Sequence, residues 1–258
     1  MTMKALVRRP GPRLTEGIVT HIDRVTVDHA KALEQWSAYR AAMGSAGWQT
    51  IDVPPADDCP DAVFIEDTMV VYGDVAIIAL SGAVSRRAET TDAEAVVAGL
   101  GYDVRFIHLP GTLDGGDVLK VRSTVYVALG GRTNAEGIAQ FRAILEPLGA
   151  VVVTVPLSKV LHLKTAVTAL PDGTIIGWRP ALDDVTAFPR FMDVPEPSGA
   201  HVVLLGDNKL LMSSDCPRTA EMFTELGYEP VIVNIDEFIK LEGCVTCLSV
   251  RLRDMPVS

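Results

Sequence analysis

The sequence predicts an α/β protein whose chain forms a closed ring of five similar units, a five-bladed α/β propeller. Three observations lead to this fold class. Helix-patterned stretches that end in glycine run directly into β-branched strands, and apolar pairs joined by turn residues precede most of these helices. The pattern returns after about fifty residues, a period typical of repeat architectures such as propellers.

The helix-to-strand junctions are the clearest of these signals. Glycine is favoured just after a helix because the residue there often has a positive φ, where a Cβ is penalised. Asp28 can cap the first helix, and Thr91 and Thr133 each stand three residues before a glutamate, the spacing of a capping box. The four junctions are Ala46-Gly47 into Trp48–Val53, Leu100-Gly101 into Tyr102–His108, Leu148-Gly149 into Ala150–Val155, and Leu226-Gly227 into Tyr228–Ile235.

Hairpins complete the predicted units. Val70–Tyr72 and Val75–Leu80 flank a Gly-Asp turn, and Val202–Leu205 and Lys209–Met212 flank a Gly-Asp-Asn turn. Each unit is therefore expected to run hairpin, helix, strand.

A degenerate unit explains the longer interval between Gly149 and Gly227. Counting it gives five units, although an ordinary α/β sandwich with similar helix ends is an alternative. No linker rich in Ser, Gly or charge divides the chain, so we expect one domain over residues 1–258. The degenerate unit holds the apolar stretch Val160–Leu170, a turn at Pro171–Gly173, a strand at Thr174–Gly177 and a short helical patch near Val185–Phe191.

Composition excludes several classes of protein. The 258 residues carry 23 Lys and Arg against 33 Asp and Glu, a formal net charge of −10, which argues against nucleic acid as the main partner and admits a cationic small substrate. The longest apolar run, around Val75–Leu80, is far too short to span a membrane. Without a signal-peptide pattern and with four cysteines, we expect a cytoplasmic protein without disulfides.

Two acidic clusters break the structural pattern. Glu66 and Asp67 interrupt an apolar run and would point to opposite faces of a strand, and an unpaired buried carboxylate is strongly destabilising. A turn with both groups in solvent is the alternative. Asp114 and Asp117 flank two glycines in what is also an ordinary turn sequence, but such a pair could orient a catalytic base beside a close backbone approach.

A cysteine and a histidine are candidates for nucleophilic catalysis. Cys244 and Cys247 have CxxC spacing, but no second ligand pair supports zinc, and the strand-like sequence after Cys247 is unusual for a dithiol redox site. One cysteine acting as nucleophile needs only a base within reach. His162, alone within an apolar run, suits a partly desolvated acid/base, although most single histidines are structural.

Arg86 and Arg132 precede the second and third predicted helices. A cation opposes the positive end of a helix dipole there, so these arginines do little for stability. A bidentate hold on a substrate carboxylate would explain them, and simple solvation is the alternative.

Taken together, these stretches resemble the dimethylarginine dimethylaminohydrolase family of the guanidino-group-modifying (pentein) superfamily. The resemblance runs from near the N-terminus to near the C-terminus in family order, and it implies a five-bladed α/β propeller. The matching stretches are Asp61–Asp67, Ser85–Glu89, Leu113–Val118, Gly131–Asn134, Leu161–Thr165 and Glu242–Ser249.

The resemblance also implies a role for individual residues. It makes Cys247 the nucleophile, His162 the general acid/base and Asp114 the carboxylate that orients the imidazole. The residues that would bind substrate are Glu66 and Asp67 at the guanidinium, Arg86 and Arg132 at the α-carboxylate, and Asp61 with the backbone carbonyls of Ile18 and Leu241 at the amino group.

The implied activity is hydrolysis of Nω,Nω-dimethyl-L-arginine, and of its monomethyl form, to citrulline and an alkylamine through a covalent thiouronium. No cofactor or metal is expected, and the chain would act as a monomer or homodimer. An arginine deiminase, an agmatine deiminase or an Nω-hydroxyarginine hydrolase would share the cysteine, histidine and acidic pair, although the two arginines count against agmatine. From another class, a CxxC redox protein or a methylarginine-binding protein is an alternative.

Overall fold

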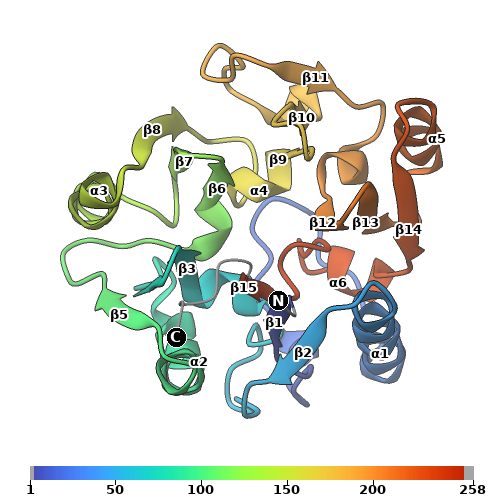
Figure 1. The fold of residues 1–258 in the computed structure, drawn as a ribbon. Helices are drawn as coiled ribbons and strands as arrows, with labels where there is room; N and C mark the ends of the chain where they lie inside the picture. Colours follow the sequence, from blue (N-terminus) through green and yellow to red (C-terminus); the bar gives the residue numbers. More distant parts are fainter. Residues whose placement is uncertain (1–2, 253–258) are drawn as a thin grey trace.

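Five small sheets surround a central axis in the computed structural model, which describes residues 3–252 (Figure 1). Each sheet has three strands, and its middle strand pairs antiparallel with one neighbour and parallel with the other. This is the five-unit ring that the repeat predicts, and the sandwich alternative is wrong. In ring order the strands are β15 (Val250–Leu252), β1 (Lys4–Val7) and β2 (Gln49–Asp52); β3 (Met69–Tyr72), β4 (Val75–Ile78) and β5 (Asp103–Phe106); β6 (Val118–Val121), β7 (Thr124–Leu129) and β8 (Val151–Pro156); β9 (Val167–Ala169), β10 (Ile175–Gly177) and β11 (Phe191–Asp193); and β12 (Val203–Gly206), β13 (Lys209–Ser213) and β14 (Glu229–Val233).

The first blade joins the two ends of the chain. Strand β1 pairs parallel with β2, and on its other side it pairs antiparallel with β15, with Leu6 opposite both Ile51 and Val250. This pairing closes the ring (Figure 1).

Four helices lie on the rim of the ring, one beside each of four blades (Figure 1). The glycines at the predicted junctions have the expected positive φ, +84° at Gly47, +90° at Gly101, +84° at Gly149 and +86° at Gly227. The rim helices are α1 (His29–Ser45), α2 (Thr90–Gly99), α3 (Ala135–Leu145) and α5 (Pro217–Glu225); two shorter helices are α4 (Leu163–Ala166) and α6 (Asp236–Ile239).

Three local predictions need correction. The patch near Val185–Phe191 forms turns, since the Asp184 carboxylate accepts hydrogen bonds from the backbone and hydroxyl of Thr186 and so competes with a helix. The fourth blade therefore has no rim helix. Asn134 caps α3 in place of Thr133, and no side chain caps α2, whereas Asp28 caps α1 as predicted.

Apolar burial between the blades holds the ring together. One core cluster joins Ile77 of β4, Val127 of β7 and Phe141 of α3, and another joins Val7 of β1 to Leu211 of β13. Full burial of such a side chain contributes about 1.5–3 kcal/mol. Each of these clusters lies between two neighbouring blades and not on the axis of the ring. Polar residues can therefore line the axis. Among residues 3–252, no helix is long and apolar enough to cross a bilayer.

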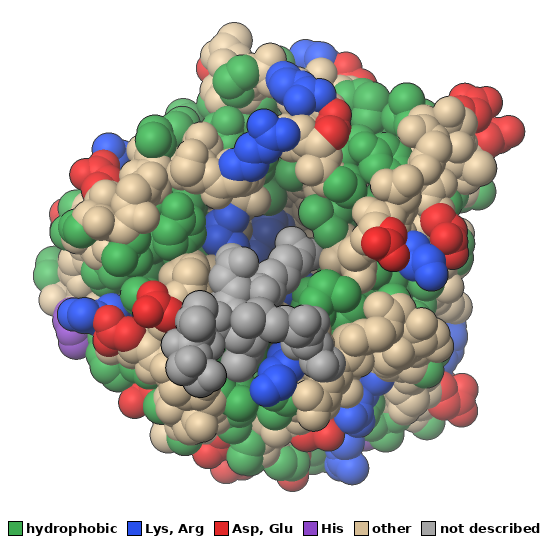
Figure 2. All heavy atoms as spheres, viewed as in Figure 1, with side chains coloured by type: hydrophobic (Ala, Val, Ile, Leu, Met, Phe, Trp, Pro, Cys, Tyr) green, Lys and Arg blue, Asp and Glu red, His purple; other side chains and the backbone are tan. Residues whose placement is uncertain are grey.

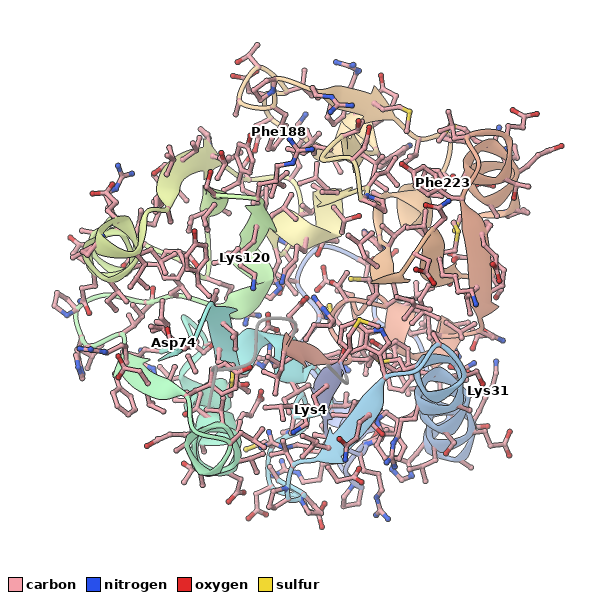
Figure 3. The ribbon with its side chains drawn as sticks, viewed as in Figure 1. Lys4, Lys31, Asp74, Lys120, Phe188 and Phe223 are labelled. Atoms are coloured by element: carbon pink, nitrogen blue, oxygen red, sulfur yellow. The ribbon has the colours of Figure 1, made fainter. Side chains whose placement is uncertain are left out.

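A cationic cavity of about 110 Å³ opens along this axis. Lys120, Lys164 and Arg251 line it together with the carboxylate of Glu66. Lysine and arginine side chains are visible in the hollow at the centre of the ring in Figure 2, and Lys120 points toward the axis in Figure 3.

Candidate active site

A second cavity gathers eight of the ten residues that the sequence assigns to the site. They lie in loops and in two 3-10 helices, Ile65–Thr68 and Val84–Glu89, so segments far apart in the sequence converge on one place. Of the described residues, none lines both this cavity and the axial one. The twelve lining residues are Ile18, Asp61, Phe64, Asp67, Arg86, Arg132, Leu161, His162, Leu241, Glu242, Gly243 and Cys247.

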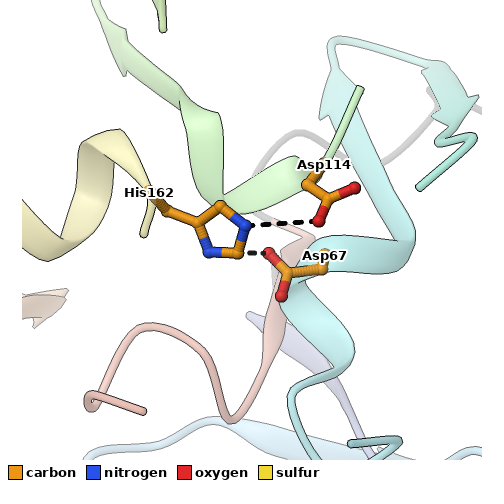
Figure 4. Close-up of side chains that lie close together, drawn as sticks. All are labelled: Asp67, Asp114 and His162. Carbon is orange, nitrogen blue, oxygen red and sulfur yellow. Dashed lines mark hydrogen bonds and ion pairs between the residues drawn. The ribbon is translucent and has the colours of Figure 1, made fainter. Parts of the chain in front are cut away.

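His162 lies between two carboxylates at the base of this cavity (Figure 4). Its Nε2 is 3.2 Å from Oδ2 of Asp114, and its Nδ1 is 3.7 Å from Oδ1 of Asp67. Burial opposes the charged imidazolium, but Asp67, Asp117 and Asp114 outweigh it and raise the pKa of His162 to about 9. The imidazole is thus held protonated near neutral pH, ready to donate a proton.

Asp67 belongs to the short 3-10 helix Ile65–Thr68 and is fixed on both oxygens. Oδ1 accepts the backbone N–H of Gly116 at 2.8 Å, and Oδ2 pairs with Nη1 of Arg86 at 2.7 Å. Burial would raise its pKa, but the positive charges of His162 and Arg86 outweigh burial and lower the pKa of Asp67 to about 2. A permanent anion therefore faces the cavity beside the imidazole.

Arg86 is held by a buried carboxylate that the sequence analysis missed. Glu89 accepts from its Nε and Nη2 at 2.9–3.2 Å, and both side chains are at most 5% exposed. The spacing of three residues, usual for ion pairs on a helix, was the signal that could have found it. Arg86 thus enters the cavity with its charge already balanced by Asp67 and Glu89.

Arg132 differs from Arg86 because part of its guanidinium has no hydrogen-bond partner. Its Nη1 is buried, lies 3.5 Å from Oδ2 of Asp114, and makes no hydrogen bond. A buried N–H donor without an acceptor lowers the stability of the protein unless a ligand supplies the acceptor. Arg132 is therefore the better placed of the two arginines to take a carboxylate.

Asp61 also lines this cavity. Both of its oxygens accept the backbone N–H of Ile18, at 3.0 and 3.2 Å, and Leu241 lines the same wall. Burial raises the pKa of Asp61 despite the nearby charge of Arg86. Asp61, Ile18 and Leu241, which the family resemblance assigns to one group, thus line the same cavity.

Asp117 and Thr133 link the backbone segments that carry Asp114 and His162. Thr133 Oγ1 donates to Asp117 Oδ2 at 2.6 Å and accepts the backbone N–H of Asp114 at 3.2 Å, and Asp117 Oδ1 accepts the backbone N–H of Leu163. Burial raises the pKa of Asp117 to about 6. The pair thus ties the loop of Asp114 to the loop of His162; only the Asp-Gly-Gly-Asp pattern hinted at this role.

Glu66 departs from the expectation. It faces the axial cavity, where Nζ of Lys164 is 2.6 Å from Oε1, Arg251 pairs with the same oxygen, and Thr246 donates to Oε2 at 2.8 Å. The two residues lie in the 3-10 helix Ile65–Thr68, so the predicted strand is wrong at this point, although Glu66 and Asp67 do line different cavities. Because three partners satisfy Glu66 outside the substrate cavity, its contact with a guanidinium is not part of the function proposed below.

Cys247 lines the cavity with its thiol next to a second thiol. The Sγ atoms of Cys247 and Cys244 are 3.3 Å apart, and the backbone carbonyl of Cys247 accepts the N–H of Glu66. Its hydrogen bond to Cys244, its burial, and the negative charges of Glu66 and Asp67 raise the pKa of Cys247. Without a cation in the cavity, the Cys247 thiol is therefore protonated.

A metal ion could in principle use part of this site. One atom each of Asp67, Asp114 and His162 lie within 4.8 Å of one another. Arg86 already pairs with Asp67, Arg132 stands beside Asp114, and His162 is itself held protonated, so these carboxylates already face positive charges that the protein supplies.

The chain is similar to proteins of one named group along nearly its whole length. The N(G),N(G)-dimethylarginine dimethylaminohydrolase of Streptomyces coelicolor is 64% identical over 252 residues, covering 98% of each chain. The structure of the Pseudomonas aeruginosa enzyme complexed with citrulline matches with a TM-score of 0.90 at 34% identity, covering 98% of this chain and all of the other.

A further solved structure is an adduct of a protein with the same name. The adduct of a dimethylarginine dimethylaminohydrolase with S-methyl-L-thiocitrulline matches with a TM-score of 0.90 at 33% identity, again over 98% of this chain and 100% of that one. No protein-family model matches the chain. Because the chain is 64% identical to the Streptomyces coelicolor protein over 98% of its length, it belongs to the dimethylarginine dimethylaminohydrolase family.

Proposed function

We propose that this protein hydrolyses Nω,Nω-dimethyl-L-arginine to L-citrulline and dimethylamine, and Nω-methyl-L-arginine to citrulline and methylamine. The observation that carries the proposal is one cavity in which a thiol, a protonated imidazole and a fixed carboxylate meet a buried arginine with an open donor. A guanidino amino acid offers a matching group to each. The names of the relatives and the bound citrulline in one of them support the same substrate class.

The substrate would be held at both ends. Arg132 and Arg86 take the α-carboxylate, and Asp61 with the backbone carbonyls of Ile18 and Leu241 takes the amino group. Asp67 receives the guanidinium. Fixing both ends aligns the central guanidinium carbon with Cys247 and removes much of the entropic barrier to attack.

The cation then activates the thiol. The hydrogen bond to Cys244, burial and the nearby carboxylates raise the pKa of Cys247, and a bound guanidinium offsets the negative charge among these causes. Substrate binding therefore favours the thiolate, whose proton passes to solvent. The thiolate adds to the central carbon, and His162 protonates the departing dimethylamine as its C–N bond breaks. A covalent thiouronium remains on Cys247.

His162 serves in the second half of the reaction as well. Having given its proton to the amine, it accepts one from water, which attacks the thiouronium carbon. Collapse of this adduct breaks the C–S bond and releases citrulline with the thiol restored. Asp114 keeps the imidazole oriented throughout, through the 3.2 Å contact with Nε2.

The proposal also covers the domain organisation, the cellular location and the oligomeric state. Residues 1–258 form one catalytic domain, in keeping with the pairing of β15 on β1. The protein works in the cytoplasm, where its four free cysteines would stay reduced, and it acts as a monomer or homodimer.

A panel of guanidines tests the assignment. We expect purified protein to release dimethylamine from dimethylarginine, while the Cys247→Ser variant releases none. Cys216→Ser is the matched control, because that buried thiol donates to the carbonyl of Ser213 away from the cavity. Ammonia from arginine as the dominant product would favour a deiminase, hydroxylamine from Nω-hydroxyarginine would favour that hydrolase, and turnover by Cys247→Ser would refute the nucleophile.

A further inference from the structure

Two thiols at the active site have the geometry of a disulfide precursor. Sγ of Cys244 lies 3.3 Å from Sγ of Cys247, and the backbone N–H of Cys247 donates to the carbonyl of Cys244 at 3.1 Å. That hydrogen bond closes a four-residue turn, whose end Cα atoms are within about 7 Å. Disulfides join Cα atoms about 4.4–6.8 Å apart, so the sulfurs need to approach by only about 1.3 Å to reach the bonded distance.

Each thiol can be reached from its own side. Cys247 lines the substrate cavity, and Cys244 lines a neighbouring, mainly apolar cavity of about 250 Å³. Leu161, Glu242 and Gly243 border both cavities and form the wall between them. Although the two thiols are only 2% and 6% exposed, a small neutral oxidant can therefore reach either sulfur.

The proposed hydrolysis does not use Cys244. Cys244 places a second thiol 3.3 Å from the proposed nucleophile, whereas the buried thiol of Cys216 donates to the carbonyl of Ser213. When either of two thiols so placed is oxidised to a sulfenic acid, the other can form a disulfide with it before further oxygen is added.

We propose that Cys244 and Cys247 form a reversible oxidation site, in which a hydroperoxide converts the pair to an intramolecular disulfide and a dithiol reductant restores it. For activity, the inference rests on the proposed role of Cys247 as nucleophile. The disulfide removes that nucleophile, so the oxidised protein is inactive and protected from irreversible oxidation.

The steps balance as follows. The Cys244 thiolate attacks one peroxide oxygen, the O–O bond breaks, and the other oxygen leaves as alcohol or water with the proton of that thiol. The Cys247 sulfur then attacks the sulfenic sulfur of Cys244, and its proton leaves with the hydroxyl as water. Two thiols lose two electrons, and the hydroperoxide gains them. The hydrogen bond from Cys247 outweighs burial and lowers the pKa of Cys244, which favours the Cys244 thiolate as the first nucleophile.

Intact mass and thiol titration test the proposal independently of catalysis. The full chain is treated with hydrogen peroxide, denatured under acid and analysed before and after dithiothreitol. We expect the wild-type protein to lose two hydrogen atoms and two of its four titratable thiols. Peptide mapping should show a disulfide between Cys244 and Cys247. Dithiothreitol should restore both thiols and citrulline formation.

Two variants make the result decisive. Cys216→Ser should still lose two hydrogen atoms, whereas Cys244→Ser should instead gain oxygen at Cys247 and resist reactivation by dithiothreitol. The proposal is overturned if the wild-type protein gains oxygen without forming the disulfide, or if Cys244→Ser recovers as completely as the wild type. If the disulfide forms but citrulline formation is unaffected, the proposed role of Cys247 fails while the oxidation site stands.

Discussion

Replacing Asp114 with asparagine removes one negative charge from the histidine site with little change in size. Asp114 is fully buried and contacts Nε2 of His162 at 3.2 Å, while its other oxygen accepts the backbone N–H of Gly82. An asparagine can keep hydrogen bonds here but cannot stabilise an imidazolium. The substitution therefore isolates the electrostatic part of the contact.

The size of the effect follows from the pKa of His162. Its rise from 6.5 to about 9 corresponds to roughly 3 kcal/mol in favour of the imidazolium, at about 1.4 kcal/mol per pKa unit. Three carboxylates produce this rise against burial, so removing Asp114 should lower the pKa of His162 by about one unit. Because His162 then holds and transfers its proton less effectively, kcat should fall by up to about 10²–10⁴-fold, the range that general acid–base catalysis contributes.

Two measurements check these values. NMR titration of isotope-labelled histidines, with His162→Gln to assign the signal, gives the imidazole pKa in both proteins. Citrulline formation from pH 5 to 10 gives kcat and kcat/KM. Asp114→Glu is the matched control, since it retains the charge and should keep the pKa near 9. An unchanged pKa and kcat in Asp114→Asn would refute the role assigned to Asp114.

Three further changes have defined outcomes. Arg132→Met should raise KM for dimethylarginine about 10–100-fold with a smaller change in kcat, because a charged hydrogen bond contributes about 1.5–3 kcal/mol; steady-state kinetics decide this. Thr133→Val should lower the free energy of unfolding by about 1–3 kcal/mol, measured in urea, since it leaves buried groups at Asp117 and Asp114 unsatisfied. The melting temperature should fall as the pH rises from 6.5 to 9, because the pKa of His162 is higher in the folded than in the unfolded protein. The protonated His162 stabilises the folded protein fully below pH 6.5, and this contribution is lost as the pH rises through about 9. His162→Gln should flatten that decline, and a wild-type melting curve independent of pH in this range would contradict it.

Local rules account for the parts of the fold that the sequence predicts correctly. The positive φ at Gly47, Gly101, Gly149 and Gly227 is a property of the chain next to each helix end, so it can be read without knowing the tertiary structure. The pairing of β15 with β1 is different. It joins residues from opposite ends of the chain, and only the requirement that five units close into a ring points to it.

In the candidate site, too, some features can be predicted from the sequence and others depend on the tertiary structure. Asp67, Cys247 and His162 are recognisable by chemical type and by the family resemblance, and the structure brings all three to one cavity. Glu66 could not be placed in the same way, because Lys164 and Arg251 reach it only across the axis of the ring. Alternation along the chain predicts that Glu66 and Asp67 diverge, but it does not tell which of them meets the substrate.

Some misassignments arise from competition between side chains and backbone. Thr133 has the spacing of a helix cap, but its hydroxyl donates to Asp117, and Asn134 caps the helix instead. Asp184 likewise prefers a turn to the start of a helix. In both cases a polar side chain had two possible backbone or side-chain partners, and tertiary contacts selected between them.

Mass spectrometry of the covalent intermediate tests the central claim most directly. The His162→Gly variant is incubated with Nω,Nω-dimethyl-L-arginine, quenched in acid and digested, and the modified peptide is sequenced. We predict an adduct equal in mass to the substrate less dimethylamine, carried on Cys247 and absent from Cys244. An adduct on another residue, or citrulline formation at the wild-type rate with no adduct, would contradict the account.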